Sequence, residues 1–265
     1  PNGALGGDVQ LMEAVATGSL DMALPSTSVL TTYSDEFGIL DMPYLFKDAK
    51  SAFAAMDGDV GKQLSEKIKS KGIDILGYTY NGPRSTTSKV KPIEKPEDLK
   101  GLKMRVMESP IFIDYYKTLG ANPTPMSFTE LYTGLQQGTV EAQENPPSLT
   151  FANKFYEVQK YSSIDEHVHN FLAFMINDAK FKSLSADDQK LLQEEAKKYV
   201  DEQRKMELKD NEKAIKDLET IGKLQTNVLT ADQKAAMRKA LQPMYDKYEA
   251  KFGKAMFDLC EKYNK

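Results

Sequence analysis

The side chains best suited to hold a small anion in this sequence are its arginines. Only four of the 35 basic residues are arginine, at positions 84, 105, 204 and 238. An arginine presents two parallel N–H donors that match a carboxylate, whereas lysine presents a point charge. Arg84 and Arg105 lie in or next to apolar stretches, so both are candidates for carboxylate binding, with a structural salt bridge as the alternative. Arg204 and Arg238 lie in lysine-rich helical segments and are expected at the surface.

The remaining reactive side chains indicate no catalytic centre. His167 and His169 are two residues apart, which would place both on one face of a strand, but no third ligand is apparent and we expect no metal site. Cys260 lies on an apolar helix face and is expected to be a packed thiol. The sequence has no phosphate-binding glycine loop, nucleophile elbow or zinc-protease motif. We therefore expect no catalytic residue and no cofactor.

Short apolar strands and amphipathic helices alternate through the first two thirds of the chain, which predicts an α/β fold with mostly parallel sheets. Asp8 is the expected N-cap of the first helix, which stops at Gly18. The other expected helices cover residues 49–56, 60–70, 110–119, 129–137 and 230–263, the last interrupted at Pro243 and Gly253; the expected strands cover residues 20–24, 73–80, 102–106 and 140–142.

One predicted helix is unusually long. Ser185 and Asp188 resemble a capping box, and neither glycine nor proline follows until Gly222, so the helix is expected to run to about Ile221. At about 1.5 Å per residue it would extend roughly 55 Å, more than the width of a small domain. Such a helix should contact two lobes.

Composition excludes several classes of function. The chain has 265 residues, which suits one large domain or two modest ones, and 40% of them are hydrophobic, as in a globular protein. Its formal net charge of -4 gives no basic excess for nucleic acid or anionic lipid. The longest apolar run, residues 171–176, is far below the ~20 residues of a membrane span. Neither nucleic-acid binding nor direct membrane insertion is expected.

Several motifs together resemble one known family. These are LGGD (residues 5–8), GSLDMA (18–23), YNGPRSTTS (80–88), GLKMRV (101–106), GANPTPMSFTELY (120–132) and VEAQENP (140–146). They are similar to motifs of the periplasmic solute-binding proteins of TRAP transporters, the DctP family, including its sialic-acid and C4-dicarboxylate binders. The resemblance covers essentially the whole chain in order.

The resemblance implies a two-lobed periplasmic-binding-protein fold, with a cleft that closes on an organic acid and a long helix that spans both lobes. It implies a periplasmic protein that delivers its ligand to TRAP membrane permease subunits and acts as a monomer. The first lobe is expected to comprise residues 1–81 and about 170–208, and the second residues 82–169 and about 209–265. A small α/β enzyme acting on an organic acid, with Arg105 as substrate clamp and Glu144 or Asp8 as base, is the alternative.

The resemblance also implies the ligand-binding residues. Arg105 matches the arginine that pairs with the ligand carboxylate, and Arg84 matches a second arginine, available for another carboxylate or a hydroxyl. The remaining matches are Asn145, which hydrogen-bonds the carboxylate, the aromatic Phe128, the first-lobe residues Asp8 and Ser26, and His167 near the cleft.

Two positions bear on the ligand. Sialic-acid binders carry a glutamate where this chain has Ser26, so a smaller acid is expected, either a C4-dicarboxylate or a sugar acid. Glu108, three residues after Arg105, would repel a second carboxylate if it faced the cleft.

The sequence given opens on Pro1-Asn2-Gly3, with no methionine and no charged-then-apolar leader, which we interpret as a mature or truncated start without its signal peptide. Family members begin with a strand, a helix and another strand before this turn. We therefore expect about 30 to 40 residues of the protein to precede the sequence given, and some ligand contacts to lie there.

Overall fold

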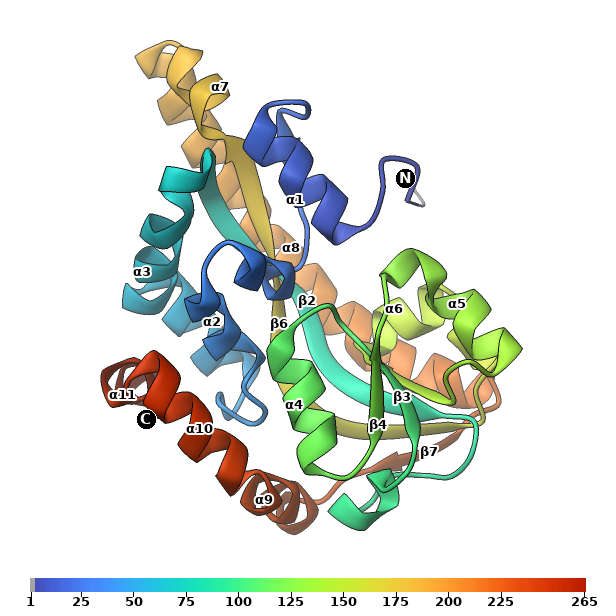
Figure 1. Cartoon of the computed structure of the whole chain (residues 1–265). Coiled ribbons are helices and arrows are strands. Elements are labelled where there is room, and N and C mark those ends of the chain that lie inside the picture. Colours follow the sequence, from blue (N-terminus) through green and yellow to red (C-terminus); the bar gives the residue numbers. More distant parts are fainter. Residues whose placement is uncertain (1–2) are drawn as a thin grey trace.

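The computed structural model describes residues 3–265, so that Pro1 and Asn2 of the predicted opening turn lie outside it. Two lobes are joined by two long strands and one long helix (Figure 1). The helices are α1 (Asp8–Thr17), α2 (Ala49–Asp57), α3 (Asp59–Ile68), α4 (Pro110–Thr118), α5 (Phe128–Gln137), α6 (Pro147–Ala152), α7 (Asp178–Ser183), α8 (Ala186–Thr220), α9 (Ala231–Ala240), α10 (Gln242–Phe252) and α11 (Lys254–Glu261). The strands are β1 (Met22–Ala23), β2 (Ile73–Ser88), β3 (Lys103–Val106), β4 (Asn122–Pro125), β5 (Ala142–Asn145), β6 (Tyr161–Asn177) and β7 (Gln225–Val228).

The described strands form one mixed sheet in the order β1-β6-β2-β5-β3-β4, with β7 beside β6. The expectation of mostly parallel sheets is wrong, because the long strands β2 and β6 run antiparallel to each other, and β1 and β5 pair antiparallel with them. Parallel pairing is confined to β3 with β4 and β5, and to β6 with β7. β2 also continues to Ser88, eight residues beyond its predicted end at Tyr80, so a single strand enters both lobes.

The first helix begins differently from its prediction. Gly7, not Asp8, is the N-cap, and its backbone N–H donates to Gln10 Oε1 at 3.0 Å. Gly7 has the extended backbone of a cap, which makes Asp8 the first helical residue. The Asp8 carboxylate is therefore left free of a capping hydrogen bond.

The predicted long helix is confirmed as α8, with 35 residues, or about 52 Å at ~1.5 Å per residue. Ser185 caps it, since its hydroxyl accepts the N–H of Asp188 at 3.1 Å. In Figure 1, α8 runs behind β2 and β6 and reaches both lobes. Arg204 Nη2 donates to the carbonyl of Tyr78, and farther along α8 Asn211 Oδ1 accepts the N–H of Ser148 at the start of α6.

The expectation that Arg204 lies at the surface is wrong, because its side chain is buried and only 4% exposed. Its guanidinium donates to Asp57 at 2.8 and 2.9 Å and lies over the ring of Phe53, 4.7 Å from its centroid. Arg204 thus connects α8 to the first lobe.

Gly82 allows α8 to pack closely where β2 turns toward the second lobe. Its φ of 116° is one that side chains disfavour, and Asn211 of α8 and Pro146 lie closer to it than a Cβ atom would permit.

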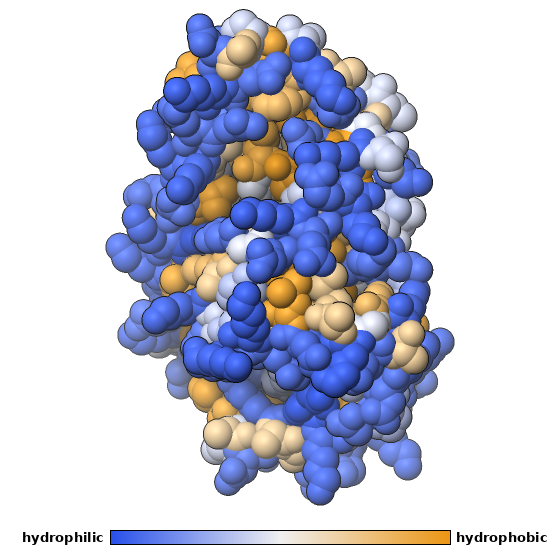
Figure 2. Space-filling view, turned by 90° about the vertical axis from the view of Figure 1, so that its left-hand side faces the viewer, coloured by the Kyte–Doolittle hydropathy of each residue, from blue (hydrophilic) through white to orange (hydrophobic). Residues whose placement is uncertain are grey.

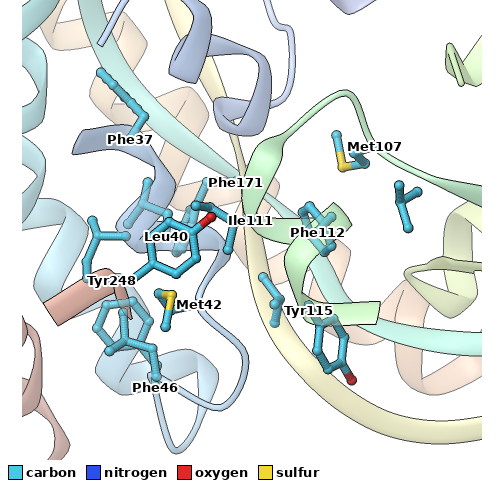
Figure 3. Close-up of a cluster of buried hydrophobic side chains, with 14 of the residues drawn as sticks. Phe37, Leu40, Met42, Phe46, Met107, Ile111, Phe112, Tyr115, Phe171 and Tyr248 are labelled. Carbon is cyan, nitrogen blue, oxygen red and sulfur yellow. The ribbon is translucent and has the colours of Figure 1, made fainter. Parts of the chain in front are cut away.

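One hydrophobic core extends through both lobes. Figure 3 shows Leu40 and Met42, which precede α2, near Ile111 of α4, with Phe37 and Phe112 on opposite sides of the same cluster. A smaller cluster of Leu131, Leu135, Val140 and Phe155 lies under α5. The C-terminal helices close the molecule on one side, where α10 packs on α4 and α11 on α3.

The surface agrees with the composition. On the face shown in Figure 2, hydrophilic residues predominate and hydrophobic ones form separate patches. No helix within residues 3–265 is both long and apolar enough to cross a membrane.

Candidate functional site

The antiparallel pairing of β2 with β5 brings Arg84 to Glu144 and Asn145. Ser85 pairs with Asn145 and Thr86 with Glu144, so Arg84 lies beside the end of β5. Arg84 Nε donates to Glu144 Oε2, and Nη2 donates to Glu144 Oε1 at 2.8 Å and to Asn145 Oδ1 at 3.0 Å. Arg84 and Glu144 are at most 1% exposed, so this is a buried, two-pronged ion pair.

His167 lies between Glu144 and a second buried carboxylate, Asp165. Its Nε2 lies 3.3 Å from Glu144 Oε2 and its Nδ1 lies 3.0 Å from Asp165 Oδ1. Since carboxylate oxygens only accept, both ring nitrogens donate and the ring is an imidazolium. Burial lowers the pKa of His167, but Asp165 and Glu144 outweigh it and raise this pKa to about 9. Burial raises the pKa of Glu144, but the charges and hydrogen bonds of Arg84 and His167 outweigh burial and lower this pKa to about 2.

Asn170 connects these charges to the first lobe. Its Oδ1 accepts from Arg84 Nη1 at 3.4 Å and from Asn81 Nδ2 at 2.9 Å, and its Nδ2 donates to Ser26 Oγ at 3.3 Å. Ser26 Oγ in turn donates to Ser28, whose hydroxyl donates to Asp41 at 2.6 Å. We call the connected side chains the buried polar network; they are Asp41, Ser28, Ser26, Asn170, Arg84, Asn145, Glu144, His167 and Asp165.

Arg105 lies beside this network and is the least satisfied of the buried cations. It is 2% exposed, at the end region of β3. Its Nε and Nη2 both donate to the carbonyl of Met126, at 2.9 and 2.7 Å. Its Nη1 is buried and has no hydrogen-bond partner within residues 3–265. Burial lowers the pKa of Arg105 to about 10, so the group remains a cation at neutral pH.

Asp8 brings a carboxylate from the first lobe toward the two arginines. Burial raises the pKa of Asp8, and the backbone N–H of Ser26 together with the charges of Arg105 and Arg84 oppose that rise. The lobes touch at this point, because a Cβ atom on Gly7 would lie only 2.6 Å from Ser127 Oγ at the start of α5. The first turn of α1 and the first turn of α5 therefore meet beside Arg105.

Phe128 is the first residue of α5, two residues after the carbonyl that Arg105 binds. Its ring packs on Phe155 with 5.7 Å between centroids and stays partly exposed. Phe128 therefore lies two residues along the chain from the carbonyl bound by Arg105, with part of its ring exposed.

The structure brings Arg84, Asn145, Ser26 and His167 together in the buried polar network and places Arg105 and Asp8 within electrostatic range of it. Sequence reasoning missed Asn170, Asp165 and the Met126 carbonyl. The signal for Asn170 was a polar residue directly before the apolar run 171–176 of β6.

His169 lies apart from His167, with its Nδ1 2.7 Å from Tyr80 Oη. Residues 3–265 hold no cluster of acidic, histidine or cysteine side chains suited to a metal.

Several surface hollows lie elsewhere, and none of the five described is lined by Arg105. The two of greatest volume measure about 670 Å³, lined by α3, β2 and α8, and about 470 Å³, lined by Tyr44, His169 and α9. The second contains the Lys234 and Glu166 ion pair, in which the cation is already neutralised. Neither hollow presents a buried cation without a partner, so the chemistry of anion binding points to Arg105.

Raising the pH is expected to weaken the fold through His167. The folded-state pKa of about 9 exceeds the ordinary histidine value of 6.5, so the stabilisation is complete below about pH 6.5 and is lost as the pH rises toward 9. Between pH 7 and 9 the free energy of unfolding should fall by on the order of 2 kcal/mol, measured by urea titration at each pH.

The variant His167→Asn provides the comparison, since its profile should be flatter over the same range. The pKa of Glu144 is about 2, and burial raises that of neighbouring Tyr115 and Tyr116 well above the ordinary value, so these groups keep their charge state. Burial raises the pKa of Asp41 to about 7, so this acid titrates near the start of the window in both proteins, and only the difference between the two profiles reports on His167. A wild-type profile as flat as that of the variant would contradict the assignment of an imidazolium.

The chain is similar to known proteins over most of its length. The family model described as "Bacterial extracellular solute-binding protein, family 7" (DctP) matches residues 1–251. The 2,3-diketo-L-gulonate-binding periplasmic protein of Escherichia coli is 38% identical over 222 residues, covering 84% of this chain and 68% of the relative.

Solved structures agree throughout the fold. The sugar acid binding protein of Advenella mimigardefordensis, in complex with galactonate, superposes with a TM-score of 0.94 at 35% identity and covers 99% of this chain and 86% of its own. A TRAP periplasmic solute-binding protein of Shewanella oneidensis with bound succinate superposes with a TM-score of 0.96 at 29% identity, covering 100% of this chain and 87% of its own. The fold is that of the two-lobed TRAP binding proteins.

Proposed function

The chain belongs to the bacterial extracellular solute-binding proteins of family 7, the DctP family, and we propose that it captures a carboxylate-containing small molecule at Arg105 by closure of its lobes. The family and its solved relatives are binding proteins for carboxylates, so the function is solute binding and not catalysis. This sets aside the alternative of a small α/β enzyme.

The free Nη1 of Arg105 is the observation that carries the proposal. A buried donor without a partner costs about 1–3 kcal/mol, and more when it is charged. The Met126 carbonyl occupies the Nε side of the guanidinium, which leaves the outer edge formed by Nη1 and the second N–H of Nη2. That edge has the spacing to donate two parallel hydrogen bonds to a carboxylate.

Residues of both lobes complete the proposed site. Asn145 is held in place by the bonds of its Oδ1 to Arg84 and its Nδ2 to Gln143. Phe128 supplies an apolar face and Asp8 an acceptor for ligand hydroxyl groups, while Ser26 and His167 support the neighbouring side chains. Because Asp8 comes from the first lobe and Arg105 from the second, a ligand that contacts both favours the closed arrangement.

The wider role follows the family. We propose that the protein works in the periplasm as a monomer and passes its ligand to TRAP membrane permease subunits. Support for the ligand class comes from relatives whose names or structures state 2,3-diketo-L-gulonate, galactonate and succinate. These are C4-dicarboxylates or sugar acids and their keto derivatives.

A thermal-shift screen across dicarboxylates, uronates, aldonates and 2-keto acids tests the proposal. A ligand present at 100 times its Kd adds about 2.7 kcal/mol of apparent stability, which corresponds to roughly 5 °C or more in Tm for a chain of this size. Galactitol serves as the matched control for galactonate, because it keeps the hydroxyl groups and lacks the carboxylate. If no acid in the screen raises Tm above its neutral counterpart, the proposed ligand class is wrong.

A further inference from the structure

The number of charges around Arg105 limits how many carboxylates a ligand can bring. Within the buried polar network, Arg84 is paired with Glu144 and the imidazolium of His167 lies between Glu144 and Asp165. The cations Arg84 and His167 and the carboxylates Glu144 and Asp165 therefore neutralise one another inside the protein. The third acid of the network, Asp41, has a pKa that burial raises to about 7, and it adds no positive charge. Neither cation of this group is left over to balance a charge on the ligand.

The donors of Arg84 lead to the same conclusion. Its Nε and Nη2 are occupied by the two Glu144 oxygens, and Nη2 also donates to the Glu144 carbonyl at 2.7 Å. The remaining nitrogen, Nη1, has a long contact of 3.4 Å to Asn170. Arg84 can thus give a single hydrogen bond to a ligand hydroxyl, but it lacks the free pair of donors that a carboxylate needs.

Arg105 is the cation with spare capacity, and three acids already act on it, of which Glu144 is also paired with Arg84 and His167. The largest neighbouring charges that shift the pKa of Arg105 are Glu144, Arg84, Asp8 and Glu108. No lysine is among the buried side chains of residues 3–265. Asp8 comes from the first lobe, and Glu108 is exposed three residues beyond Arg105. A first ligand carboxylate gains from Arg105, whereas a second would meet the field of Asp8 and Glu108, and the described residues offer no further unpaired buried cation to receive it.

We infer that the ligand is a monocarboxylate carrying hydroxyl groups, in the manner of an aldonate, and that the corresponding dicarboxylates bind much more weakly. This deepens the proposed function and rests on it. The hydroxyl groups of the ligand can be bound where a second ligand carboxylate cannot, because the Asp8 carboxylate can accept a hydrogen bond from a hydroxyl and Arg84 Nη1 can donate one to it.

The test uses pairs of acids that differ only at the far end of the carbon chain. Erythronate and tartrate have four carbons, galactonate and galactarate six; in each pair a terminal CH2OH is replaced by a second carboxylate. Calorimetry on the whole chain at pH 7 should give at least about tenfold tighter binding of the monoacid in the pair whose length fits the site.

The outcomes separate the two proposals. A diacid, including succinate, that binds as tightly as the monoacids would overturn the inference and leave the proposed function supported. Absence of binding by every mono- and diacid in the panel would overturn the proposed function, and the inference with it.

A surface variant tests the electrostatic cause. Glu108→Gln removes an exposed carboxylate near Arg105 and touches no buried contact. We expect it to strengthen binding of the diacids several-fold and to change binding of the monoacids less, so that the ratio of the two affinities falls. Glu94→Gln, a substitution at an exposed position eleven residues before Arg105 in the sequence, should leave the ratio unchanged. An unaltered ratio in Glu108→Gln would contradict the role of charge in the preference.

Discussion

Arg105→Ala should weaken binding of the organic acid by at least tenfold. A charge-assisted hydrogen bond contributes about 1.5–3 kcal/mol net, which corresponds to about 10- to 150-fold in Kd. Arg105 is 2% exposed, and the ligand would be its partner in a site shielded from water, so the loss should lie toward the upper part of that range. Isothermal titration calorimetry with the tightest acid from the screen measures it.

Two further variants make this result specific. Arg105→Lys should also lose affinity, because the ammonium is a point charge and cannot reproduce the two parallel donors. Lys103→Ala removes an exposed cation from the same strand, two residues away, and should bind normally. Circular dichroism and Tm of each variant establish that it folds. Affinity in folded Arg105→Ala equal to that of the wild type would show that the carboxylate binds elsewhere.

Glu144→Gln should destabilise the protein by about 3–5 kcal/mol. The substitution keeps the shape of the side chain but leaves the buried charges of Arg84 and His167 without their shared carboxylate. The cost arises because a buried cation without a counter-ion has lost its hydration and gained nothing in return. Urea unfolding at pH 7 provides the free energy of unfolding.

A double-mutant cycle separates the ion pair from other effects. Arg84→Met alone should also be strongly destabilising, whereas the double variant Arg84→Met/Glu144→Gln should lose less than the sum of the two single changes. Glu94→Gln, at an exposed position, should change stability by no more than about 0.5 kcal/mol. Additive losses in the cycle would mean that Arg84 and Glu144 do not stabilise each other.

Much of the local structure was predictable because its signals are local. Ser185 and the absence of glycine and proline until Gly222 predicted α8, and the structure confirms it. The helices after Ser109 and before Gly138 also appear where their breakers predict them. Helix caps and breakers act on residues three or four positions away, so a linear sequence contains both partners of each interaction.

Apart from the N-cap of α1, which is Gly7 and not Asp8, the errors concern partners distant in the sequence. Arg204 was expected at the surface because its helical neighbours are lysines, yet Asp57 and the Tyr78 carbonyl reach it from elements more than 120 residues earlier. The antiparallel pairing of β2 with β6 was not expected, since strand direction depends on the path of the whole chain and not on the composition of either strand.

For the site, the sequence by itself determined which side chains are chemically able to bind a carboxylate: few arginines stand out among many lysines, and the motif around Arg105 identifies the family. Only the tertiary structure decided which arginine is free to bind. The register of β2 and β5 joins Arg84 to Glu144, 60 residues away, while Arg105 keeps an unpartnered nitrogen. The physical reason is that two arginines of equal charge differ in function through the counter-ions that folding brings to them.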